Sequence, residues 1–459
     1  MRVTLVSYGA SYAPISVRFL TQSTKSSSTA LQVVPRSEHN ISRANISTAA
    51  LKVLYRLRDG GFDGYLVGGS VRDLLLGRHP KDFDIATDAT PEEVHELFNN
   101  SRLIGRRFRL VHVRFGREII EVATFRAPAN SDDDDHQVAE DSGRVLRDNV
   151  WGTLEEDALR RDFTVNSLYY GISDFAIRDY AGGVADIEAR QLRLMGEPEQ
   201  RYREDPVRML RAARFAAKLD FDLAPSTAEP ISRLASLLDH IPSARLFDEF
   251  GKLFQSGHAL ASWQQLQRFE LLIHLFPFTA MWLNNDPDGV RLRYIELALS
   301  NTDERVAQEK PITPMFLFAV FLWGPISGRA RQLQEEEQMS QVQALVAAGA
   351  ELTAQQCARI ALPKRFSLPM REIIQMQPRF ESRQARKVRG LLGHRRFRAA
   401  YDLFALRVKL GEVGQDALDW WTEVQNGPEY AQLAAKPADV SRSRRKPRNR
   451  RKNTKSSGS

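Results

Sequence analysis

Cysteine is almost absent from this sequence, since Cys357 is the single one among 459 residues. A disulfide framework is therefore excluded, and a lone thiol is typical of a protein that works in a reducing compartment. Long apolar runs are also missing, because the longest, from Met315 to Trp323, has about half the length that a helix needs to cross a bilayer. We therefore expect a cytoplasmic protein without a membrane-spanning segment.

Acidic residues are missing from both ends of the chain. None precedes Glu38, and this Ser- and Thr-rich segment lacks sustained helical periodicity, so residues 1–40 are predicted to be a disordered leader, with a transit peptide as the alternative. None follows Asp439, and the basic residues there crowd among Ser, Asn and Pro, so residues 429–459 are predicted to be a basic disordered tail. Such a tail can neutralise phosphates of any sequence, which predicts non-specific nucleic-acid binding. A tail that only improves solubility is the alternative.

The middle of the chain has an ordinary globular composition, with 42% hydrophobic and 27% charged residues. Its first part alternates short β-rich runs with helical signals, and from about Glu204 the pattern becomes almost wholly helical. This shift predicts an α+β fold, in which a small sheet domain precedes an all-helical neck and body. The predicted boundaries are 45–187 for the sheet domain, 188–250 for the neck and 251–428 for the body.

A strand, a tight turn and a helix are predicted in succession after residue 64. Tyr65–Val67 is a short β-forming run, and Gly68-Gly69-Ser70 precedes a stretch with helical spacing that stops at Gly77. Two glycines and a serine let the backbone approach a ligand closely, and the free N–H groups of the following helix favour a phosphate. A plain tight turn is the alternative.

Two aspartates follow this turn closely. Residues 81–86 are predicted to form a strand in which Asp82 and Asp84 fall on one face, and Phe83 and Ile85 on the other. Two like charges on one face repel each other unless a cation lies between them, and carboxylate oxygens suit Mg²⁺. A solvated strand edge is the alternative, but the neighbouring turn favours metal ligands. We therefore predict that Asp82 and Asp84 are catalytic and hold Mg²⁺.

Nucleotidyl transfer with two metal ions needs a further carboxylate near the attacking hydroxyl. Glu121 lies in an otherwise apolar β-rich run, where an acid is costly without a partner. Asp162 is flanked by Arg160 and Arg161, which could hold triphosphate oxygens, although a structural ion pair between Asp162 and an arginine is the alternative. Glu121 and Asp162 both remain candidates for the third catalytic carboxylate.

A helix with a basic face is predicted from Val207 to Lys218, opened by Asp205-Pro206. Val207 and Phe215 intrude on the basic face, so it is not expected to lie fully in water and could contact a base. A solvated charge stripe is the alternative. The basic face contains Arg208, Arg211, Arg214 and Lys218, and the opposite, buried face contains Met209, Leu210, Ala213, Ala216 and Ala217.

Together these motifs resemble the class II nucleotidyltransferase superfamily, which contains the tRNA CCA-adding enzymes and the bacterial poly(A) polymerases. The matching segments are 66–73, 82–84, 160–166, 179–187 and 204–215. The resemblance implies that the sheet domain is the nucleotidyltransferase catalytic domain and that Mg²⁺ is its cofactor. In the family, an Asp and an Arg of the last motif pair with the incoming base, so the resemblance gives this role to Asp205 and Arg208. The nucleotide-binding residues implied in this way are Gly68, Gly69, Ser70, Arg72, Asp73, Arg161, Asn166, Asp205, Arg208, Arg211 and Arg214.

One segment separates the two activities of the superfamily. Residues 103–113 carry the pattern Gly-Arg-Arg-Phe-x-Leu-x-His-Val, which resembles the bacterial poly(A) polymerase signature, whereas CCA-adding enzymes usually carry Gly-Thr followed by Val or Ile. Further matches extend the resemblance over about residues 35–425. The predicted RNA contacts are Arg106, Arg107, Arg444, Arg445, Arg448, Arg450 and Arg451.

The expected function is therefore the template-independent addition of AMP from ATP to RNA 3′ ends, which in bacteria promotes RNA decay. The first alternative is a CCA-adding tRNA nucleotidyltransferase, and the second is an inactive RNA-binding protein on the same scaffold. The expected partners are ATP, RNA 3′ ends and the RNA-decay machinery, and the expected state is a monomer.

Overall fold

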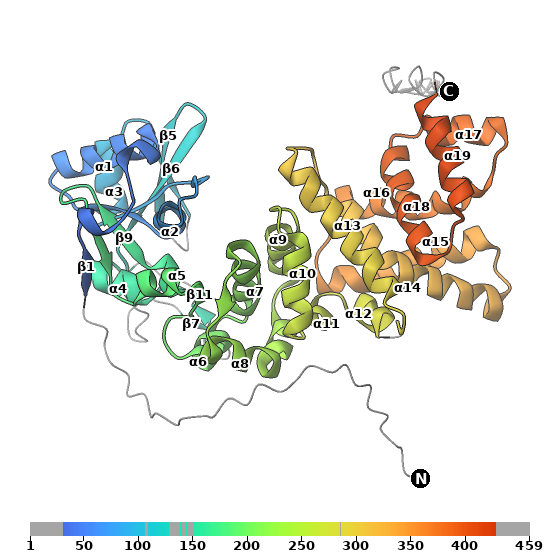
Figure 1. Cartoon of the computed structure of the whole chain (residues 1–459), viewed down its shortest axis with the longest axis horizontal. Helices are drawn as coiled ribbons and strands as arrows, with labels where there is room; N and C mark the ends of the chain where they lie inside the picture. Colours follow the sequence, from blue (N-terminus) through green and yellow to red (C-terminus); the bar gives the residue numbers. More distant parts are fainter. Residues whose placement is uncertain are drawn as a thin grey trace, which may run out of the picture.

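The computed structural model describes residues 31–105, 109–127, 138–139, 144–145, 150–284 and 286–427. A mixed eight-stranded sheet with flanking helices forms the N-terminal part, and helices form nearly all of the rest (Figure 1). This confirms the predicted α+β class, with a small sheet domain followed by helices. Among the described residues, no helix has both the length and the apolar character that crossing a membrane requires.

The strands of the main sheet lie in the order β1-β10-β9-β2-β3-β6-β5-β4. Strands β3 and β6 pair in parallel, whereas the other neighbours in this sheet pair antiparallel. A separate antiparallel pair joins β7 and β8. The strands are β1 (Gln32–Val34), β2 (Gly64–Val67), β3 (Asp84–Thr87), β4 (Ser101–Ile104), β5 (Leu110–Phe115), β6 (Glu118–Thr124), β7 (Val138–Ala139), β8 (Arg144–Val145), β9 (Leu168–Gly171) and β10 (Ile177–Asp179).

Helices accompany the sheet and then continue as the neck and the body. Those of the sheet domain are α1 (Thr48–Asp59), α2 (Gly69–Leu75), α3 (Pro91–Leu97), α4 (Leu154–Leu159) and α5 (Gly183–Glu188), with the 3₁₀ turns η1 (Arg36–Glu38), η2 (Arg43–Asn45) and η3 (Thr164–Asn166). Those of the neck are α6 (Pro198–Glu204), α7 (Val207–Leu219), α8 (Pro225–Leu234), η4 (Ala235–His240) and α9 (Ser243–Phe254). Those of the body are α10 (Ala259–Arg268), α11 (Leu272–Leu275), α12 (Pro277–Leu283), α13 (Val290–Ala307), α14 (Pro314–Glu337), α15 (Gln341–Arg359), α16 (Lys364–Gln375), η5 (Gln377–Glu381), α17 (Ala385–Leu392), α18 (Phe397–Arg407), η6 (Val408–Leu410) and α19 (Gln415–Asn426).

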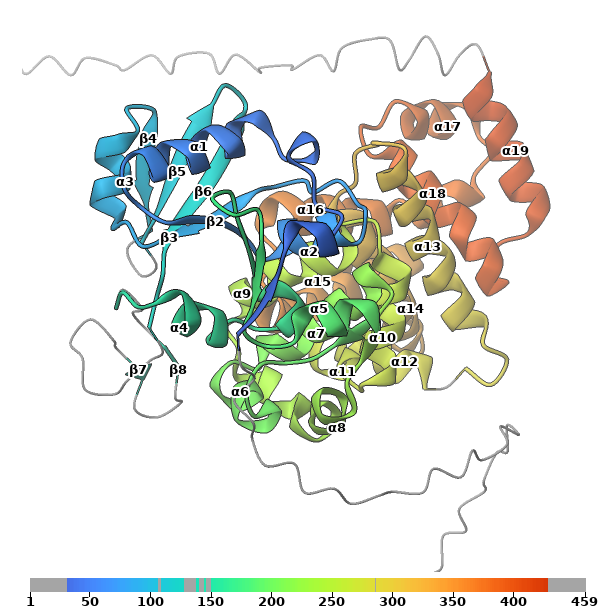
Figure 2. The same cartoon turned by 60° about the vertical axis from the view of Figure 1, so that its left-hand side comes forward.

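The two faces of the sheet carry different side chains, because successive residues of a strand point to opposite sides. Leu66, Ile85 and Val122 lie in register on neighbouring strands and are buried on the face that α1 covers (Figure 2). Val67 lies on the opposite face, where it packs in a smaller cluster with Ala158 of α4. Residues 84 and 121 share this second face, so the strand period alone directs both acids to the same side.

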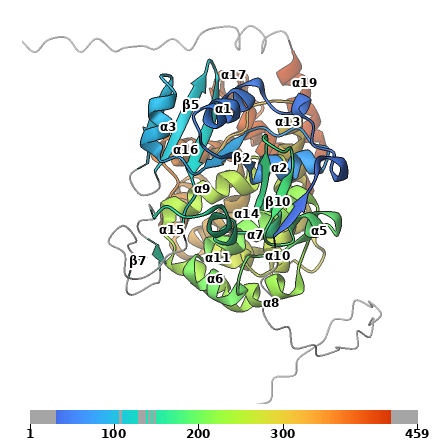
Figure 3. The same ribbon diagram turned by 90° about the vertical axis from the view of Figure 1, so that its left-hand side faces the viewer.

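The neck and the body share one aromatic core. The ring of Phe250 on α9 lies 4.5 Å from that of Phe318 on α14, and the ring of Trp263 on α10 lies 5.1 Å from that of Phe321. All four side chains are buried. The predicted boundary between the neck and the body, at residue 250, therefore falls inside α9. Figure 3 shows the neck helices α6, α7 and α8 below the sheet.

Two boundaries and the content of the neck differ from the sequence-based expectation. Strand β3 begins at Asp84 instead of residue 81, so Asp82 precedes the strand. The predicted disordered leader reached residue 40, but residues 32–34 form edge strand β1, because they pair with β10 and bury Val34. The predicted all-helical neck also contains a short parallel pair, formed by β11 (Gln191–Leu192) and β12 (Asp222–Leu223).

The segment 179–187, which resembles a family motif, forms a tightly packed turn and the helix α5. The buried carboxylate of Asp179 accepts backbone hydrogen bonds from Ala181 at 3.0 Å, Gly183 at 3.0 Å and Val184 at 2.9 Å. Helix α5 then packs so closely on η3 that a Cβ atom at Gly183 would overlap the carbonyl oxygen of Thr164. A glycine is therefore required where α5 meets η3.

We predict that Gly183→Ala lowers the free energy of unfolding by about 1 to 3 kcal/mol, because the backbone of η3 has to move. Gly328→Ala in α14 is the matched control, since a Cβ atom there meets no atom within 4 Å. Alanine also suits a helix interior better than glycine. Chemical denaturation of both variants measures the difference, and equal stabilities would show that α5 and η3 are not tightly packed.

Candidate active site

A row of side chains crosses four strands on the second face of the sheet. Val67 on β2 pairs in register with Asp84 on β3, Asp84 with Glu121 on β6, and Glu121 with His112 on β5. The Nε2 atom of His112 lies 3.2 Å from Oε1 of Glu121. The parallel pairing of β3 with β6 thus places Asp84 and Glu121 side by side, although 36 residues separate them in the sequence.

The surroundings of Asp84 disfavour the ionised form of its carboxylate. Partial burial among the neighbouring strands, followed by the charge of Glu121, raises the pKa of Asp84 from its ordinary value of 3.8 to about 6. Arg161 opposes this increase, and Asp82 adds to it. Solvent still reaches the Asp84 side chain. The site therefore contains negative charge that protein cations compensate only in part.

Asp82 lies two residues before Asp84, and its side chain is exposed, whereas Phe83 between them is buried. The alternation predicted from the sequence is confirmed at these positions. Among the described residues, no group of three or more His, Cys, Asp or Glu side chains gathers closely enough to hold a metal ion alone. Mg²⁺ commonly binds one or two protein carboxylates and takes its other ligands from water and substrate phosphates.

The glycine turn lies at the end of β2, next to this row. Gly68 has φ +72°, a conformation that glycine adopts without strain. The hydroxyl of Ser70 donates to the carbonyl of Val67 at 3.0 Å and so fixes the turn. A Cβ atom at Gly68 would lie 3.5 Å from Nη1 of Arg161, which therefore lies beside the turn. The structure thus places Arg161 and Asp84 next to the turn.

Arg72 and Asn166 are hydrogen-bonded to each other next to the glycine turn. The Arg72 side chain is buried, and its Nη1 atom donates to Oδ1 of Asn166 at 2.5 Å. Its Nε and Nη2 atoms donate to Oδ1 of Asp73 at 2.9 and 2.7 Å. These three predicted nucleotide-binding residues are thus close to the turn, with Arg72 already engaged by protein acceptors.

Asp157 and Tyr169 are site residues that the sequence analysis missed. The Nη2 atom of Arg161 donates to Oδ2 of Asp157 at 2.9 Å, and its Nε atom donates to the Tyr169 hydroxyl at 2.8 Å. Burial disfavours the charge of Asp157, but Arg161 and Arg160 outweigh it and hold the pKa at about 2. This cluster fixes the Arg161 guanidinium beside Asp84. The signal in the sequence was weak, because Asp157 lies in an ordinary acidic first turn of α4.

Asp162 does not lie in the carboxylate row. Its Oδ2 atom accepts from Nε of Arg211 at 2.9 Å and also from Nη2 of Arg211. Its Oδ1 atom accepts from the Phe163 amide at 2.9 Å and from Nδ2 of Asn166 at 3.2 Å. Burial opposes the charge, but Arg211 outweighs it and lowers the pKa of Asp162. The arrangement matches the ion-pair alternative, and it joins the sheet domain to α7.

The basic face of α7 is half-buried, as the sequence predicted. Oδ2 of Asp205 accepts from Nη2 of Arg245 on α9 at 2.6 Å, and Arg208 donates to Oε2 of Glu204 at 2.9 Å. The Arg214 guanidinium carbon lies 4.2 Å from the centre of the Phe215 ring. The expected buried positions on the opposite side are confirmed except Ala217, which is only half-buried.

Several predicted RNA contacts lie outside the described residues. These are Arg106 and Arg107 and the tail arginines Arg444, Arg445, Arg448, Arg450 and Arg451. Their roles therefore stay predictions, as do the tail from residue 429 and the leader up to residue 30.

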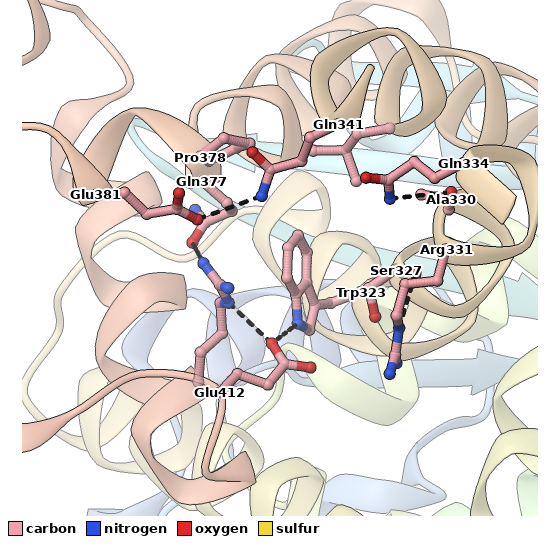
Figure 4. Close-up of a pocket in the computed structure, with 12 residues that line it drawn as sticks. Trp323, Ser327, Ala330, Arg331, Gln334, Gln341, Gln377, Pro378, Glu381 and Glu412 are labelled. Carbon is pink, nitrogen blue, oxygen red and sulfur yellow. Dashed lines mark hydrogen bonds and ion pairs between the residues drawn. The ribbon is translucent and has the colours of Figure 1, made fainter. Parts of the chain in front are cut away.

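A pocket of about 330 Å³ lies in the body, away from the sheet (Figure 4). Its polar side chains bind one another: Oε2 of Glu412 accepts from Nε1 of Trp323 at 2.8 Å and from Nε of Arg407 at 2.9 Å. Gln341 in turn donates to Oε1 of Glu381 at 3.3 Å. These bonds join α14 and α18 through Glu412 and join α15 to η5, which favours a structural role.

Three family models match successive parts of the chain. They are the Poly A polymerase head domain over residues 64–193, the probable RNA and SrmB- binding site of polymerase A over 220–283, and the polymerase A arginine-rich C-terminus over 337–455. A CCA-adding enzyme from Bacillus stearothermophilus, solved in complex with CTP, has a similar fold. Its TM-score is 0.55 at 26% identity, and the match covers 84% of this chain and 80% of that one.

Curated relatives with the two activities of the superfamily differ in how much of this chain they match. Poly(A) polymerase I of Salmonella typhi is 48% identical over 399 residues, which are 86% of each chain. A CCA-adding enzyme of Lactobacillus helveticus is 40% identical over only 215 residues, 47% of this chain and 52% of that enzyme. The polymerase match spans the sheet domain, the neck and much of the body, and the CCA-adding match spans about half of the chain. This nucleotidyltransferase therefore belongs to the bacterial poly(A) polymerase I family.

Proposed function

We propose that this protein adds AMP from ATP to RNA 3′ ends without a template and releases pyrophosphate. The observation that carries the proposal is the register pairing of Asp84 with Glu121 beside the glycine turn. The similarity to poly(A) polymerase I over 86% of the chain supports adenylate as the transferred group. The proposed setting is the cytoplasm, where RNA 3′ ends and the RNA-decay machinery would be its partners and the chain would act as a monomer.

Asp82 and Asp84 fit a Mg²⁺ site. Their donor atoms are carboxylate oxygens, which Mg²⁺ prefers, and a bound cation would offset the burial and the negative charge of Glu121 that together raise the pKa of Asp84. When bound, Mg²⁺ would supply electrostatic stabilisation of the triphosphate and of the attacking 3′ hydroxyl. The protein residues then have to place the two reactants and compensate the remaining charge.

Glu121 is the third carboxylate that we propose, because it is the register neighbour of Asp84 and Asp162 is bound by Arg211. Beside Asp84, the Glu121 carboxylate can orient the 3′ hydroxyl of the RNA or accept its proton. Its contact with His112 fixes the direction of the side chain. Asp162 would act by positioning Arg211 and Asn166.

The triphosphate would lie at the glycine turn. Gly68 and Gly69 leave space for the phosphate oxygens, and Arg161 lies beside the turn with its guanidinium already held by Asp157 and Tyr169. Such a preorganised cation needs no rearrangement when negative charge develops on the leaving pyrophosphate. Arg72 would support the turn from below.

Base selection would take place on α7. Asp205 and Arg208 are held by Arg245 and Glu204, so an adenine edge would meet side chains whose directions are already set. Pairing with the wrong base would leave a half-buried polar group without a partner, which costs about 1 to 3 kcal/mol. Arg211 and Arg214 would complete this basic face.

The first prediction from this proposal separates the two carboxylates. We expect Glu121→Gln to lower kcat by about a hundredfold or more with the KM for ATP little changed, because its role is in the transition state. Asp162→Asn should instead raise the KM for ATP and lower the melting temperature, because it releases Arg211. Glu118→Gln, at the exposed start of β6, is the control. A large kcat loss in Asp162→Asn with Glu121→Gln near wild type would reverse the assignment.

The second prediction concerns the nucleotide. Incubation with a short RNA and each NTP in turn should show ATP preferred over CTP, and Arg208→Ala should reduce this preference by about ten- to a hundredfold. Arg203→Ala, an exposed arginine on α6, is the matched control. A wild-type protein that adds CCA to a tRNA and then stops would support a CCA-adding enzyme and contradict the proposal.

A further inference from the structure

Lys218 is a half-buried cation near the C-terminal end of α7 for which the described part of the chain offers no hydrogen-bond acceptor and no ion-pair partner. Arg214, one turn earlier on the same face, is similar, because its Nε atom is buried without a partner among the described residues. By contrast, Arg211 and Arg208 on this face have carboxylate partners. The Lys218 ammonium and the Nε atom of Arg214 therefore lie one turn apart on α7 without a hydrogen-bond partner among the described residues.

Other cations surround Lys218. Burial lowers its pKa, and the charges of Arg72, Arg214 and Lys81 lower it further. Asp73 has the largest single charge effect on this pKa and raises it, although its carboxylate also binds Arg72. If the basic face of α7 were only a solvated charge stripe, it would lie in water, and the pKa of Lys218 would not be lowered by burial.

The loop that leads from α2 to the catalytic acids completes this cluster. The guanidinium of Arg78 donates to the backbone carbonyls of Lys218 at 3.4 Å and Leu219 at 3.3 Å, which fixes the loop on the end of α7. Lys81 follows in the same loop and directly precedes Asp82. The cations therefore extend from the end of α7 to the acids that we assign to Mg²⁺.

The start of α10 borders the cluster from the side of the body. His258 precedes α10, and burial, together with the charges of Lys218, Arg78 and Lys81, lowers its pKa, whereas Asp303 opposes this. The Asp303 carboxylate is already engaged, since it accepts from the amides of Ala259 at 2.6 Å and Leu260 at 3.0 Å. These bonds hold the Asp303 carboxylate at the start of α10, and its charge acts on His258 against three cations, Lys218, Arg78 and Lys81.

An anion with several oxygens fits such a group of cations, and a phosphate is the anion that both substrates carry. The triphosphate is assigned to the glycine turn, at the N-terminal end of α2, whereas Arg78 and Lys81 follow its C-terminal end. The length of α2, about 10 Å at 1.5 Å per residue, separates these positions. An RNA strand that leaves the acids along the loop of Lys81 and Arg78 would reach the end of α7.

We propose that Lys218, with Arg78 and Lys81, binds the phosphodiester next to the 3′-terminal nucleotide of the RNA, and so places the 3′ hydroxyl at the catalytic acids. This inference rests on the proposed function, because it assumes that RNA 3′ ends are the acceptor. Lys218 is thus a binding residue for the RNA strand, distinct from the residues assigned to ATP.

Steady-state kinetics of Lys218→Ala and Lys218→Gln test the site. Loss of one charged contact to a phosphate should raise the KM for a short RNA by about tenfold, with kcat and the KM for ATP within about twofold. Lys218→Arg should restore most of the RNA affinity. Lys52→Ala, an exposed lysine on α1, is the matched control, and melting curves show whether each variant folds.

An RNA with a neutral methylphosphonate at a single linkage identifies the phosphate. In the wild type, the modification nearest the 3′ end should raise the KM for RNA about as much as Lys218→Ala does, and in Lys218→Ala it should add little further. An increase in the KM for ATP instead of RNA would assign the cluster to the triphosphate and overturn the proposal. Additive effects of the modification and the substitution would also overturn it. A wild type that does not extend RNA at all would contradict the proposed function itself.

Discussion

The pairing of Asp84 with Glu121 on the parallel strands β3 and β6 is the constraint on which the rest of the site depends, because burial and then the charge of Glu121 disfavour the ionised Asp84 carboxylate. A folded chain keeps two carboxylates this close only if other interactions hold the strands in register. The buried residues Leu66, Ile85 and Val122 on the opposite face supply that stability. Packing on the apolar face of the sheet therefore stabilises the pairing of β3 with β6, which the acids on the opposite face destabilise.

Ion pairs extend the site from the sheet to the neck. Arg161 is fixed by Asp157 and Tyr169 within the sheet domain, whereas Asp162, one residue later, binds Arg211 on α7. Two consecutive residues thus link the two parts of the proposed ATP site. Arg161 is proposed to bind the triphosphate, and Asp162 holds Arg211, which is proposed to lie near the adenine. In the proposed function, this connection would let an ATP bound at the glycine turn present its adenine to α7.

Local patterns in the sequence predicted much of the site, because strand alternation and turn chemistry act over a few residues. Asp82 and Asp84, the turn at Gly68 and the half-buried basic face of α7 are all of this kind. The pairing of β3 with β6 could not be predicted, since a parallel pair joins strands that are distant in sequence and leaves no periodic signal. For the same reason the sequence could not choose between Glu121 and Asp162. The leader boundary was misplaced because β1 is an edge strand of three residues, too short to show alternation.

Thermal melting of the wild type and Asp84→Asn with and without Mg²⁺ tests the central claim most directly. The pKa of Asp84 is raised in the folded state to about 6, so its ionisation costs stability as the pH rises from about 4 to 6, and the full cost remains above pH 6. Without metal, Asp84→Asn should therefore melt above the wild type at pH 7.5 and equal it near pH 4. Mg²⁺ should raise the melting temperature of the wild type at pH 7.5 and leave that of Asp84→Asn almost unchanged. An equal response of both proteins to Mg²⁺, or no gain from the substitution at pH 7.5, would contradict the account.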